Sequence, residues 1–347
     1  MTNILILYSE LAGYIVSCLN YYAKNNPENK IHVVRWPINN EAPFKFKFEK
    51  NIRIINKSDV NLNDYLINQK INLIICCGWF DKEYVKCIKN NPKITSILMF
   101  DNYWENTLKQ KIGKMIIPKI LTPYFNYCWI PGKIQEIYAL KLGFKKQNIF
   151  KGFYATDLSN FIKIYKKRNN QNYFIESKKM LYVGRYLKLK GVLDLWKAFI
   201  NFSKTNPDWE LHCVGDGNLY KSRIKHDKII HHGFIQPDEL AKLALDKSVF
   251  IMPSHFDHWG MAVQEFAASG LPLICSDKVG SVNEFLKINK NGFSFKAKNV
   301  KSLELAMHKI SNLKRNEIIE YGDYSHELSK IYDNKTWTYT LNEIIHQ

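Results

Sequence analysis

The sequence predicts an α/β protein of two domains, each built on a parallel sheet. Short, almost wholly apolar segments alternate with helical stretches along the chain, as buried parallel strands and their crossover helices do. The length of 347 residues exceeds what one hydrophobic core usually serves and fits two domains of roughly 150 residues each. A hydrophobic content of 46% excludes a disordered chain.

Eleven apolar segments are expected to be strands. In the first half they lie at residues 3–9, 30–36, 51–56, 71–78, 94–100 and 126–132. In the second half they lie at 179–185, 209–215, 229–235, 249–254 and 271–276. The polar, basic segment 157–177 is interpreted as a linker. The predicted organisation is therefore a first domain at 1–160, a second at 161–323 and a helical tail at 324–347.

The composition predicts a soluble cytoplasmic protein with anionic ligands. Only six of the 50 basic residues are arginine, and the abundance of Lys, Asn and Ile is typical of AT-rich coding, so part of the net charge of +18 is background. The rest of the positive charge favours an anionic partner, such as a nucleotide diphosphate or an acidic lipid surface. The lysines are dispersed, so nucleic acid is not expected as a partner. The seven cysteines form no CxxC pair, and no apolar segment is long enough to span a membrane.

The most informative segment runs from residue 250 to residue 284. An apolar strand delivers Asp257 into a loop, and Gly260 turns the chain into a helix that holds Glu265 about two turns from its start. The start of a helix attracts anions. The backbone groups that would meet a phosphate here belong to Gly260, Met261 and Ala262. Two carboxylates that flank a phosphate site suit a nucleotide-sugar, because they can accept hydrogen bonds from its sugar hydroxyls at one end and its ribose hydroxyls at the other.

A second cluster, LYVGRYLKLKG, places a strand end at Arg185 and a helix start near Gly191. Arg185 can hold phosphate oxygens with two parallel hydrogen bonds, and Lys190 adds a compact charge from the other side of the loop. The alternative is a surface Arg and Lys on a basic protein. His255, Asp257 and His258 lie too close together in one loop to share a metal ion, so no metal site is expected.

These residues resemble the family four retaining glycosyltransferases with the GT-B fold. The matching motifs are Pro253-Ser254, Gly260, Glu265-Phe266-Ala267, Gly270-Leu271-Pro272 and Ser276, together with G-R-x4-K-G at 184–191. Asp257 stands where the E-x7-E signature of that family has its first Glu. The resemblance implies two Rossmann-like domains that face each other across a cleft, with the acceptor in the first domain and a tail that crosses back to it.

The resemblance also implies a chemistry. Arg185 and Lys190 would neutralise the departing diphosphate, Asp257 would hold the donor sugar, and Glu265 would bind the ribose. A donor phosphate oxygen would take the proton of the acceptor, so the reaction would need no protein nucleophile, metal or cofactor. The substrates would be a nucleotide-diphosphate sugar and a glycan or lipid-linked acceptor.

Several further residues are candidates for the two substrates. Phe234 is predicted to touch the edge of the base, with a buried turn aromatic as an equal alternative. The ring of His258 or of Trp259 is predicted to touch a substrate. Gly13 would allow the donor to approach the loop after the first strand. Asp101 and Trp104 are predicted to contact the acceptor, and the alternative role of Asp101 is a helix N-cap.

Two segments mix basic and apolar residues in a way that suits an anionic membrane surface. They are 109–120 and 44–48, and each also fits an ordinary half-buried helix or strand. The sequence as a whole predicts a retaining, metal-independent glycosyltransferase, cytoplasmic or peripheral on the inner face of the plasma membrane. The rivals are another GT-B enzyme (an inverting transferase with Asp101 as its base, or a nucleotide-sugar epimerase) and a non-catalytic basic protein that binds membrane or nucleic acid.

Overall fold

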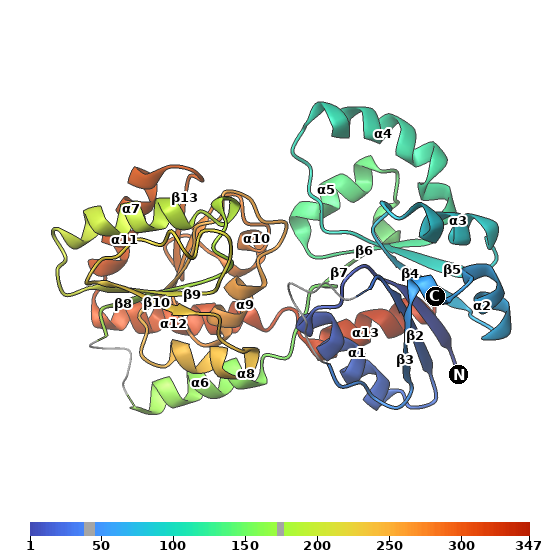
Figure 1. The fold of residues 1–347 in the computed structure, drawn as a ribbon, viewed down its shortest axis with the longest axis horizontal. Helices are drawn as coiled ribbons and strands as arrows, with labels where there is room; N and C mark the ends of the chain where they lie inside the picture. The colour runs from blue at the N-terminus through green and yellow to red at the C-terminus, as the bar shows by residue number, and fades with distance from the viewer. Residues whose placement is uncertain (38–45, 172–176) are drawn as a thin grey trace. The chain divides into compact units, whose positions relative to one another are not determined.

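The structure, a computed structural model, describes residues 1–37, 46–171 and 177–347. The chain divides into two compact domains (Figure 1). The first comprises residues 1–157 and 332–347, and the second comprises residues 158–331. Each domain contains one sheet of parallel strands with helices on both faces, so the predicted α/β architecture is confirmed.

The first domain contains a seven-stranded sheet whose neighbouring strands are all parallel. Its strands are β1 (Asn3–Leu7), β2 (Lys30–Arg35), β3 (Ile52–Asn56), β4 (Leu73–Cys77), β5 (Thr95–Met99), β6 (Tyr127–Ile130) and β7 (Ile149–Lys151). Their order is β3-β2-β1-β4-β5-β6-β7, so the winding reverses between β1 and β4. Its helices are α1 (Gly13–Asn25), α2 (Leu62–Asn68), α3 (Lys82–Asn90), α4 (Leu108–Ile120), α5 (Lys133–Lys141) and α13 (Asn334–Ile345).

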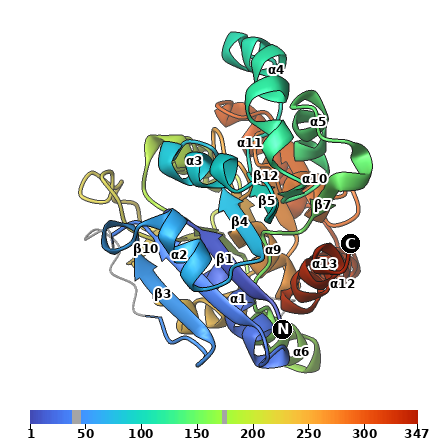
Figure 2. The same ribbon diagram turned by 90° about the vertical axis from the view of Figure 1, so that its right-hand side faces the viewer.

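The two faces of this sheet are buried under different helices (Figure 2). Ile4 and Ile6 of β1 pack with α1 and α13 on one face, whereas Leu5 and Leu7 pack with α2, α3 and α5 on the other. Alternate side chains of a strand point to opposite faces. β1 is therefore apolar at four successive positions, which is the pattern that predicted a strand buried on both sides.

The end of the chain belongs to the first domain. Trp337 of α13 is buried between the rings of Trp129 and Tyr22, whose centroids lie 4.9 and 6.2 Å away. The side-chain amide of Asn334 donates to Ser17 Oγ of α1 over 2.8 Å. The segment that passes into the first domain starts at residue 332, whereas residue 324 lies inside α12 (Arg315–Ser329) of the second domain.

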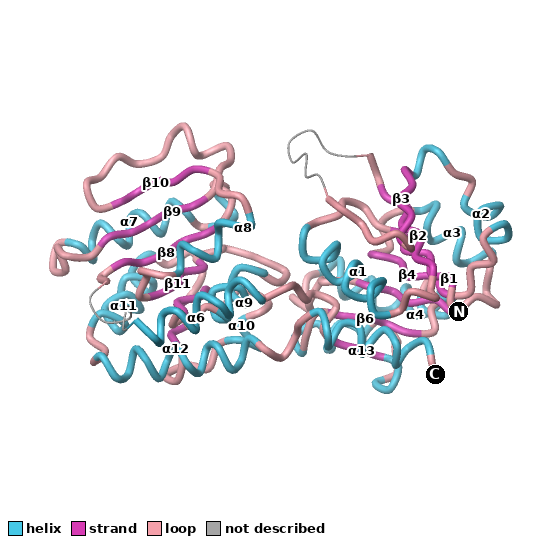
Figure 3. Tube along the Cα trace, turned by 90° about the horizontal axis from the view of Figure 1, so that it is seen from below, coloured by secondary structure: helices cyan, strands magenta, loops and turns pink. Residues whose placement is uncertain are grey.

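The second domain contains a six-stranded sheet of parallel strands. The strands are β8 (Lys179–Val183), β9 (Glu210–Val214), β10 (Ile229–Gly233), β11 (Val249–Met252), β12 (Leu273–Ser276) and β13 (Gly292–Phe295). Their order is β10-β9-β8-β11-β12-β13, so the winding reverses between β8 and β11. Besides α12, the helices are α6 (Ser159–Gln171), α7 (Val192–Ser203), α8 (Pro237–Leu240), α9 (Met261–Ala268), α10 (Val282–Phe285) and α11 (Val300–Ser311) (Figure 3).

The prediction of a linker at 157–177 is wrong, because most of this segment forms α6. Phe161, Ile164 and Arg168 are buried, and their spacing of three and four residues places them on one face of the helix. The ring of Phe161 packs edge to face against Phe266 of α9, with centroids 5.7 Å apart. The polar residues between these positions interrupt the pattern of the buried face, which packs against the rest of the second domain.

The described part of segment 44–48 packs inward. Phe46 and Phe48 are partly buried against the core beneath α1, and Lys47 between them is exposed. Phe44 and Lys45 lie outside the described residues. No helix in the described ranges has both the length and the apolar character required to cross a membrane.

Candidate active site

The candidate site of the second domain lies where its strand order reverses, between β8 and β11. In open parallel sheets the loops that follow the strands on either side of such a point form a crevice that binds ligands. Arg185 follows β8 and Asp257 follows β11. Two of the residues predicted to be catalytic therefore come from the two loops that meet at this point.

These two loops are held together by their backbones. The amide of His255 donates to the carbonyl oxygen of Leu189 over 2.8 Å. Gly191 has a φ of +71°, and a Cβ at this position would lie 1.9 Å from the carbonyl oxygen of Pro253. Only glycine allows this approach. A further bond joins His255 Nε2 to Asp194 Oδ2 of α7 over 2.8 Å.

The approach of the loops brings Lys190 to Asp257. Lys190 Nζ donates to Asp257 Oδ2 over 2.5 Å. The aspartate is fixed through its backbone, because its amide donates to Lys278 and its carbonyl oxygen accepts from Gly280, each over 3.0 Å. Its other carboxylate oxygen accepts from the amide of Trp259 over 3.3 Å. The opposite charges predicted on separate loops thus lie together at fixed positions.

Arg185 presents a charge that the described residues leave unpaired. Its side chain is exposed and makes no hydrogen bond or ion pair with any residue in the described ranges. Its backbone is held, because the hydroxyl of Tyr182 donates to its carbonyl oxygen over 2.9 Å. On the other side, a Cβ on Gly215 would lie 2.0 Å from the carbonyl oxygen of Gly184, so the loop after β9 packs tightly here. The guanidinium donors are therefore available to an anion.

The start of α9 supplies backbone donors. Gly260 occupies the N-cap position with a φ of +87°, and no side chain caps the helix. The first amides of a helix have no acceptor within it. The amides of Met261 and Ala262 are two such groups, and they add a partial positive charge to the region that follows Asp257.

Glu265 lies further along α9 and is half-buried. Its carboxyl group forms no hydrogen bond or ion pair with the described residues. Loss of solvent around it raises its pKa from 4.5 to about 7. A half-buried carboxyl without a partner is suited to accept hydrogen bonds from a ligand hydroxyl, which would stabilise its ionised form.

The aromatic candidates differ in accessibility. Phe234, which follows β10, is 57% exposed, so it is not the buried turn residue of the alternative interpretation. The ring of His258 packs edge to face against Phe256, with centroids 4.8 Å apart. Trp259 is buried against Phe285, so of the two predicted ring contacts only that of His258 remains open to a substrate. Among the described residues, no group of three or more potential metal-binding side chains lies close together.

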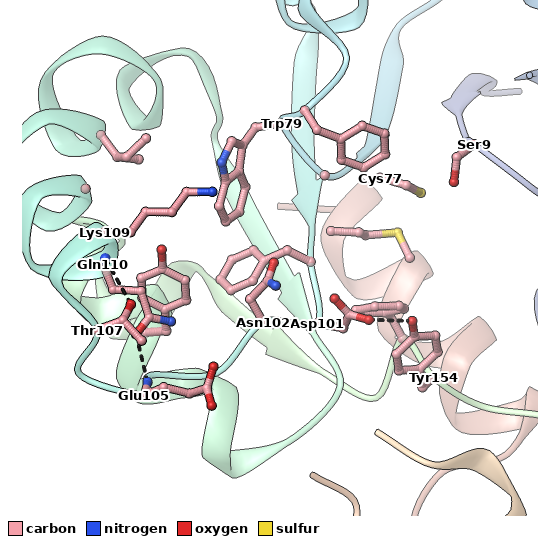
Figure 4. A pocket seen from close by; sticks show the side chains of 18 of the residues that line it. Ser9, Cys77, Trp79, Asp101, Asn102, Glu105, Thr107, Lys109, Gln110 and Tyr154 are labelled. Carbon is pink, nitrogen blue, oxygen red and sulfur yellow. Dashed lines mark hydrogen bonds between the residues drawn. The ribbon is translucent and has the colours of Figure 1, made fainter. Parts of the chain in front are cut away.

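The first domain holds a separate cavity of about 750 Å³ (Figure 4). It is lined by residues that end or follow β1, β4, β5 and β7, at the edge where parallel sheets bind ligands. Its wall is rich in large apolar side chains, among them Trp79, Phe80, Met99, Phe100, Tyr138 and Phe153. Residues of α4 form another part of the wall.

Asp101 lines this cavity, as its predicted contact with an acceptor requires. The hydroxyl of Tyr154 donates to Asp101 Oδ2 over 2.9 Å (Figure 4). Burial raises the pKa of Tyr154 well above its usual value, so its phenol stays protonated and can donate this bond. Asp101 is not the N-cap of the following helix, because Thr107 caps α4.

Two other candidates of the first domain lie outside the cavity wall. Trp104 packs against Tyr138, and Lys141 Nζ lies 4.8 Å from the centroid of its ring. Gly13 opens α1, and no atom lies within 4 Å of where its Cβ would be, so the chain itself does not require glycine there.

Sequence reasoning missed most of the cavity wall, including Tyr154 and Trp79. Tyr154 follows β7, a strand of three residues that was not predicted. The sequence offered one signal, because Gly152 separates the apolar Ile149-Phe150 from Phe153 and has a φ of +88°. A glycine in that position is typical of the turn at the end of a short strand.

Comparisons with known proteins agree with this geometry. Residues 163–324 match the family model described as glycosyl transferases group 1. The chain is 29% identical over 139 residues to a glycogen synthase of Mycobacterium tuberculosis, covering 38% of this chain and 33% of that protein. It is 24% identical over 169 residues to the lipopolysaccharide 1,6-galactosyltransferase of Salmonella typhimurium, covering 44% and 46%. The chain thus spans about a third to a half of the length of these curated relatives.

Solved structures match over the whole chain. Sucrose-phosphate synthase from Thermosynechococcus elongatus superposes with a TM-score of 0.76 at 14% identity, covering 100% of this chain and 99% of that one. Anabaena HepE in complex with UDP-glucose superposes with a TM-score of 0.70 at 12% identity, covering 99% of each chain. At these identities the likeness shows the fold, and it confirms GT-B. Residues 163–324 thus resemble the glycosyl transferases group 1 family, and the two Rossmann-like domains of the chain have the GT-B fold.

Proposed function

We propose that this protein is a retaining glycosyltransferase that moves a sugar from a nucleotide-diphosphate sugar to a glycan or lipid-linked acceptor. The supporting observation is that three positive groups follow the two strands, β8 and β11, between which the winding of the second sheet reverses. They are the unpaired guanidinium of Arg185, the ammonium of Lys190 beside Asp257, and the uncapped start of α9. A departing diphosphate needs such fixed cations and backbone donors to stabilise its growing charge.

Each residue of the site has a distinct proposed role. Arg185 and Lys190 bind the diphosphate, and the amides that follow Gly260 bind its other oxygens. Asp257 holds hydroxyls of the donor sugar and stabilises the positive charge that develops at the anomeric carbon. Glu265 accepts hydrogen bonds from the ribose hydroxyls. The exposed ring of Phe234 contacts the base, and His258 lies beside the donor sugar. The acceptor attacks the face that the nucleotide leaves, and a donor phosphate oxygen takes its proton.

The proposed donor is a UDP-sugar, supported by the UDP-glucose complex of the structurally similar HepE. The proposed acceptor binds in the cavity of the first domain, where Asp101 orients its hydroxyl. The match to a lipopolysaccharide galactosyltransferase supports a place in the synthesis of surface polysaccharide or glycoconjugate. The reaction would then take place in the cytoplasm, at the inner face of the plasma membrane.

Three alternative functions are distinguishable by experiment. An inverting transferase would need a general base, and Asp101 is the candidate. A nucleotide-sugar epimerase would consume the donor without an acceptor. A non-catalytic membrane-binding or nucleic-acid-binding protein would not need an unpaired Glu265 on α9.

The test is a binding and hydrolysis screen across UDP-, GDP- and ADP-sugars, with the anomeric configuration of the product read by NMR. The expected result is binding of one nucleotide class at about 1 μM to 1 mM, the common range for enzyme substrates, with slow hydrolysis that retains configuration and persists in EDTA. Inverted product would support the inverting transferase, and a free epimeric nucleotide-sugar would support the epimerase. Absence of binding to every nucleotide-sugar would remove the proposed function.

A further inference from the structure

α4 of the first domain exposes an unusual amount of apolar surface. None of its residues is buried. Leu108, Ile112, Met115, Ile116 and Ile120 are all exposed, and Leu108 and Met115 are 73% and 70% exposed. Their spacing of i, i+4, i+7, i+8 and i+12 places these five side chains on one face of the helix, called here the apolar face of α4. A soluble domain rarely leaves five such side chains together in water without a partner.

The helix is held at its two ends, which leaves this face uncovered within the domain. At the start, the side-chain amide of Gln110 donates to the carbonyl oxygen of Tyr103 over 2.8 Å, and its Oε1 accepts from the amide of Glu105 over 2.8 Å. At the end, Ile117 is partly buried in the core under α3 and α5, and Pro118 packs against Gly143. Figures 1 and 2 show α4 at the margin of the first domain.

The charges on α4 are all positive. Lys109, Lys111, Lys114 and Lys119 are exposed, and the helix contains no acidic residue. A helix of 13 residues, about 20 Å long, that combines an apolar face with lysines suits the interface of an anionic bilayer. The apolar side chains enter the boundary of the acyl chains while the long lysine side chains reach the phosphates.

The apolar face continues into the cavity that holds Asp101. Ile112 and Ile116 line this cavity and are 51% and 46% exposed. Lys109 lies on the same wall. A molecule with a polar head and an apolar tail could therefore lie with its head near Asp101 while its tail follows α4 outward without leaving apolar surroundings.

We infer that α4 docks the first domain on an anionic lipid bilayer and that the acceptor is an amphiphile taken from that bilayer into the cavity. This inference rests on the proposed function for the identity of the cavity as the acceptor site, but the docking of α4 does not. The occupant that we propose for the apolar face is lipid. A second copy of this chain is the rival occupant, since apolar faces also form dimers, but four lysines on each copy would repel one another.

The test is co-sedimentation of the full chain with vesicles of phosphatidylcholine alone or mixed with phosphatidylglycerol. Binding is expected to the mixed vesicles, and to fall with salt. The variant Lys111→Glu/Lys114→Glu should weaken it by about 25-fold or more, at about fivefold per lysine near an anionic surface. Met115→Asp should weaken it by about tenfold or more, because it places a charge in the apolar face. None of these three residues lines the cavity.

Matched controls separate docking from general charge or exposure. Lys163→Glu/Lys166→Glu makes the same charge change, at the same spacing, on an exposed face of α6 in the second domain. Ile67→Asp replaces an apolar residue of α2 that is 73% exposed, close to the exposure of Met115. Both controls should bind the mixed vesicles as the natural chain does. Equal loss in controls and α4 variants would overturn the inference, as would failure of the natural chain to sediment with anionic vesicles.

Other outcomes separate this inference from its rival and from the proposed function. If the chain self-associates in sedimentation velocity, loses this with Met115→Asp and ignores vesicles, the occupant is a second copy and the inference is wrong. Nucleotide binding without vesicle binding would overturn the inference alone and leave the proposed function standing. Vesicle binding without nucleotide-sugar binding would overturn the proposed function and leave the docking of α4 standing.

A second experiment tests the amphiphilic acceptor with octyl glucoside below its micelle concentration. Octyl glucoside should bind more tightly than glucose, and it should protect the thiol of Ile116→Cys from a thiol reagent. Equal affinity for the two sugars would refute the amphiphilic acceptor.

Discussion

Lys190 and Asp257 are 67 residues apart in sequence, yet their side chains form an ion pair of 2.5 Å. Their loops follow strands on either side of the reversal point of the second sheet. Both side chains are largely shielded from water, so the cost of desolvating the two charges offsets much of their attraction. Its main effect is to hold a cation and a carboxylate side by side where donor phosphate and donor sugar are proposed to meet.

Replacement of Lys190 should therefore affect turnover far more than folding. Lys190→Met removes a cation from the proposed diphosphate site, and we expect kcat for sugar transfer or donor hydrolysis to fall about 100-fold or more. The midpoint of thermal unfolding should change little. Lys188→Met, in the same exposed turn, is the control and should keep full activity. A variant at position 190 with normal turnover would show that the ion pair is only structural.

Arg185 should be essential for turnover and dispensable for the fold. Its guanidinium is exposed and has no partner among the described side chains. The unfolding midpoint of Arg185→Ala should therefore equal that of the natural chain within experimental error. Loss of two parallel bonds to the departing diphosphate should lower kcat by about 100- to 1,000-fold. Arg185→Lys should recover only part of this loss, because an ammonium group cannot form the fork. Arg315→Ala on the surface of α12 serves as the control, and equal activity of the two alanine variants would contradict the prediction.

Glu265 should make stability and nucleotide binding depend on pH in opposite ways. Between its unfolded value of 4.5 and its folded pKa of about 7, the folded protein keeps a proton that the unfolded chain has released. The folded state therefore binds more protons in this window, and its stability falls as pH rises through it. Glu265→Gln should raise the unfolding midpoint at pH 8 relative to the natural chain and change it little at pH 5.

The same substitution should weaken nucleotide binding, because an amide offers one acceptor where a carboxylate offers two. Ribose bonds favour the ionised carboxylate, so UDP affinity of the natural chain should rise with pH up to about 7, relative to the Gln variant. Calorimetry with UDP at pH 5, 6, 7 and 8 measures both curves, and the titration of UDP itself cancels in their ratio. Parallel curves for the two proteins would remove Glu265 from the ribose site.

Gly191→Ala should destabilise the second domain by roughly 2–4 kcal/mol, because the new Cβ would combine a strained φ with a backbone clash. That Cβ would lie 1.9 Å from the carbonyl oxygen of Pro253, so the loop that carries Lys190 must move away from the loop that carries Asp257. Urea unfolding measures the loss. Gly113→Ala in α4 is the control, because only Ile117 Cγ1 at 3.9 Å meets its Cβ, and alanine favours a helix. Similar stability of the two variants would contradict the close approach.

Asp101→Asn should affect the acceptor and spare the donor. The substitution keeps an oxygen that can accept from Tyr154, but it removes the charge that would strengthen a bond to an acceptor hydroxyl. We expect the KM for acceptor to rise about tenfold while donor hydrolysis in the absence of acceptor stays unchanged. Tyr154→Phe should produce a smaller rise, since it only frees the carboxylate to turn. If donor hydrolysis falls as steeply as transfer, Asp101 acts on the donor or as a general base.

The strand pattern was predictable because parallel strands buried on both faces are apolar at successive positions. β1 shows this, with Ile4 and Ile6 in one core and Leu5 and Leu7 in the other. All eleven predicted strands are present, and the two that were missed, β7 and β13, have three and four residues. Such short strands offer too few residues for a pattern to stand out. α6 was missed because Phe161, Ile164 and Arg168 are separated by polar residues and one of the three buried positions is itself charged.

The candidate site also has a part that the sequence predicted and a part that it did not. Gly260, Glu265, Arg185 and Lys190 were identified from local order along the chain, because a strand, a tight turn and a helix start must be adjacent in sequence to present an anion site. The cavity of the first domain was not identified, because its wall combines segments that are far apart in the sequence, at the ends of β1, β4, β5 and β7 and along α4. Tyr154 and Asp101 are 53 residues apart, and nothing in the intervening sequence relates them.

By itself, the sequence determined the class of fold, the positions of most strands, and the charged residues that a nucleotide-sugar would need. The tertiary structure decided which of them meet: that Lys190 lies against Asp257, that Glu265 has no partner among the described residues and that the ring of Trp259 is buried. The physical reason is the separation along the chain of the residues that interact. Backbone periodicity and turn chemistry depend on residues a few positions apart. Contacts between loops depend on the order in which strands assemble and on how closely a glycine such as Gly191 lets two backbones approach.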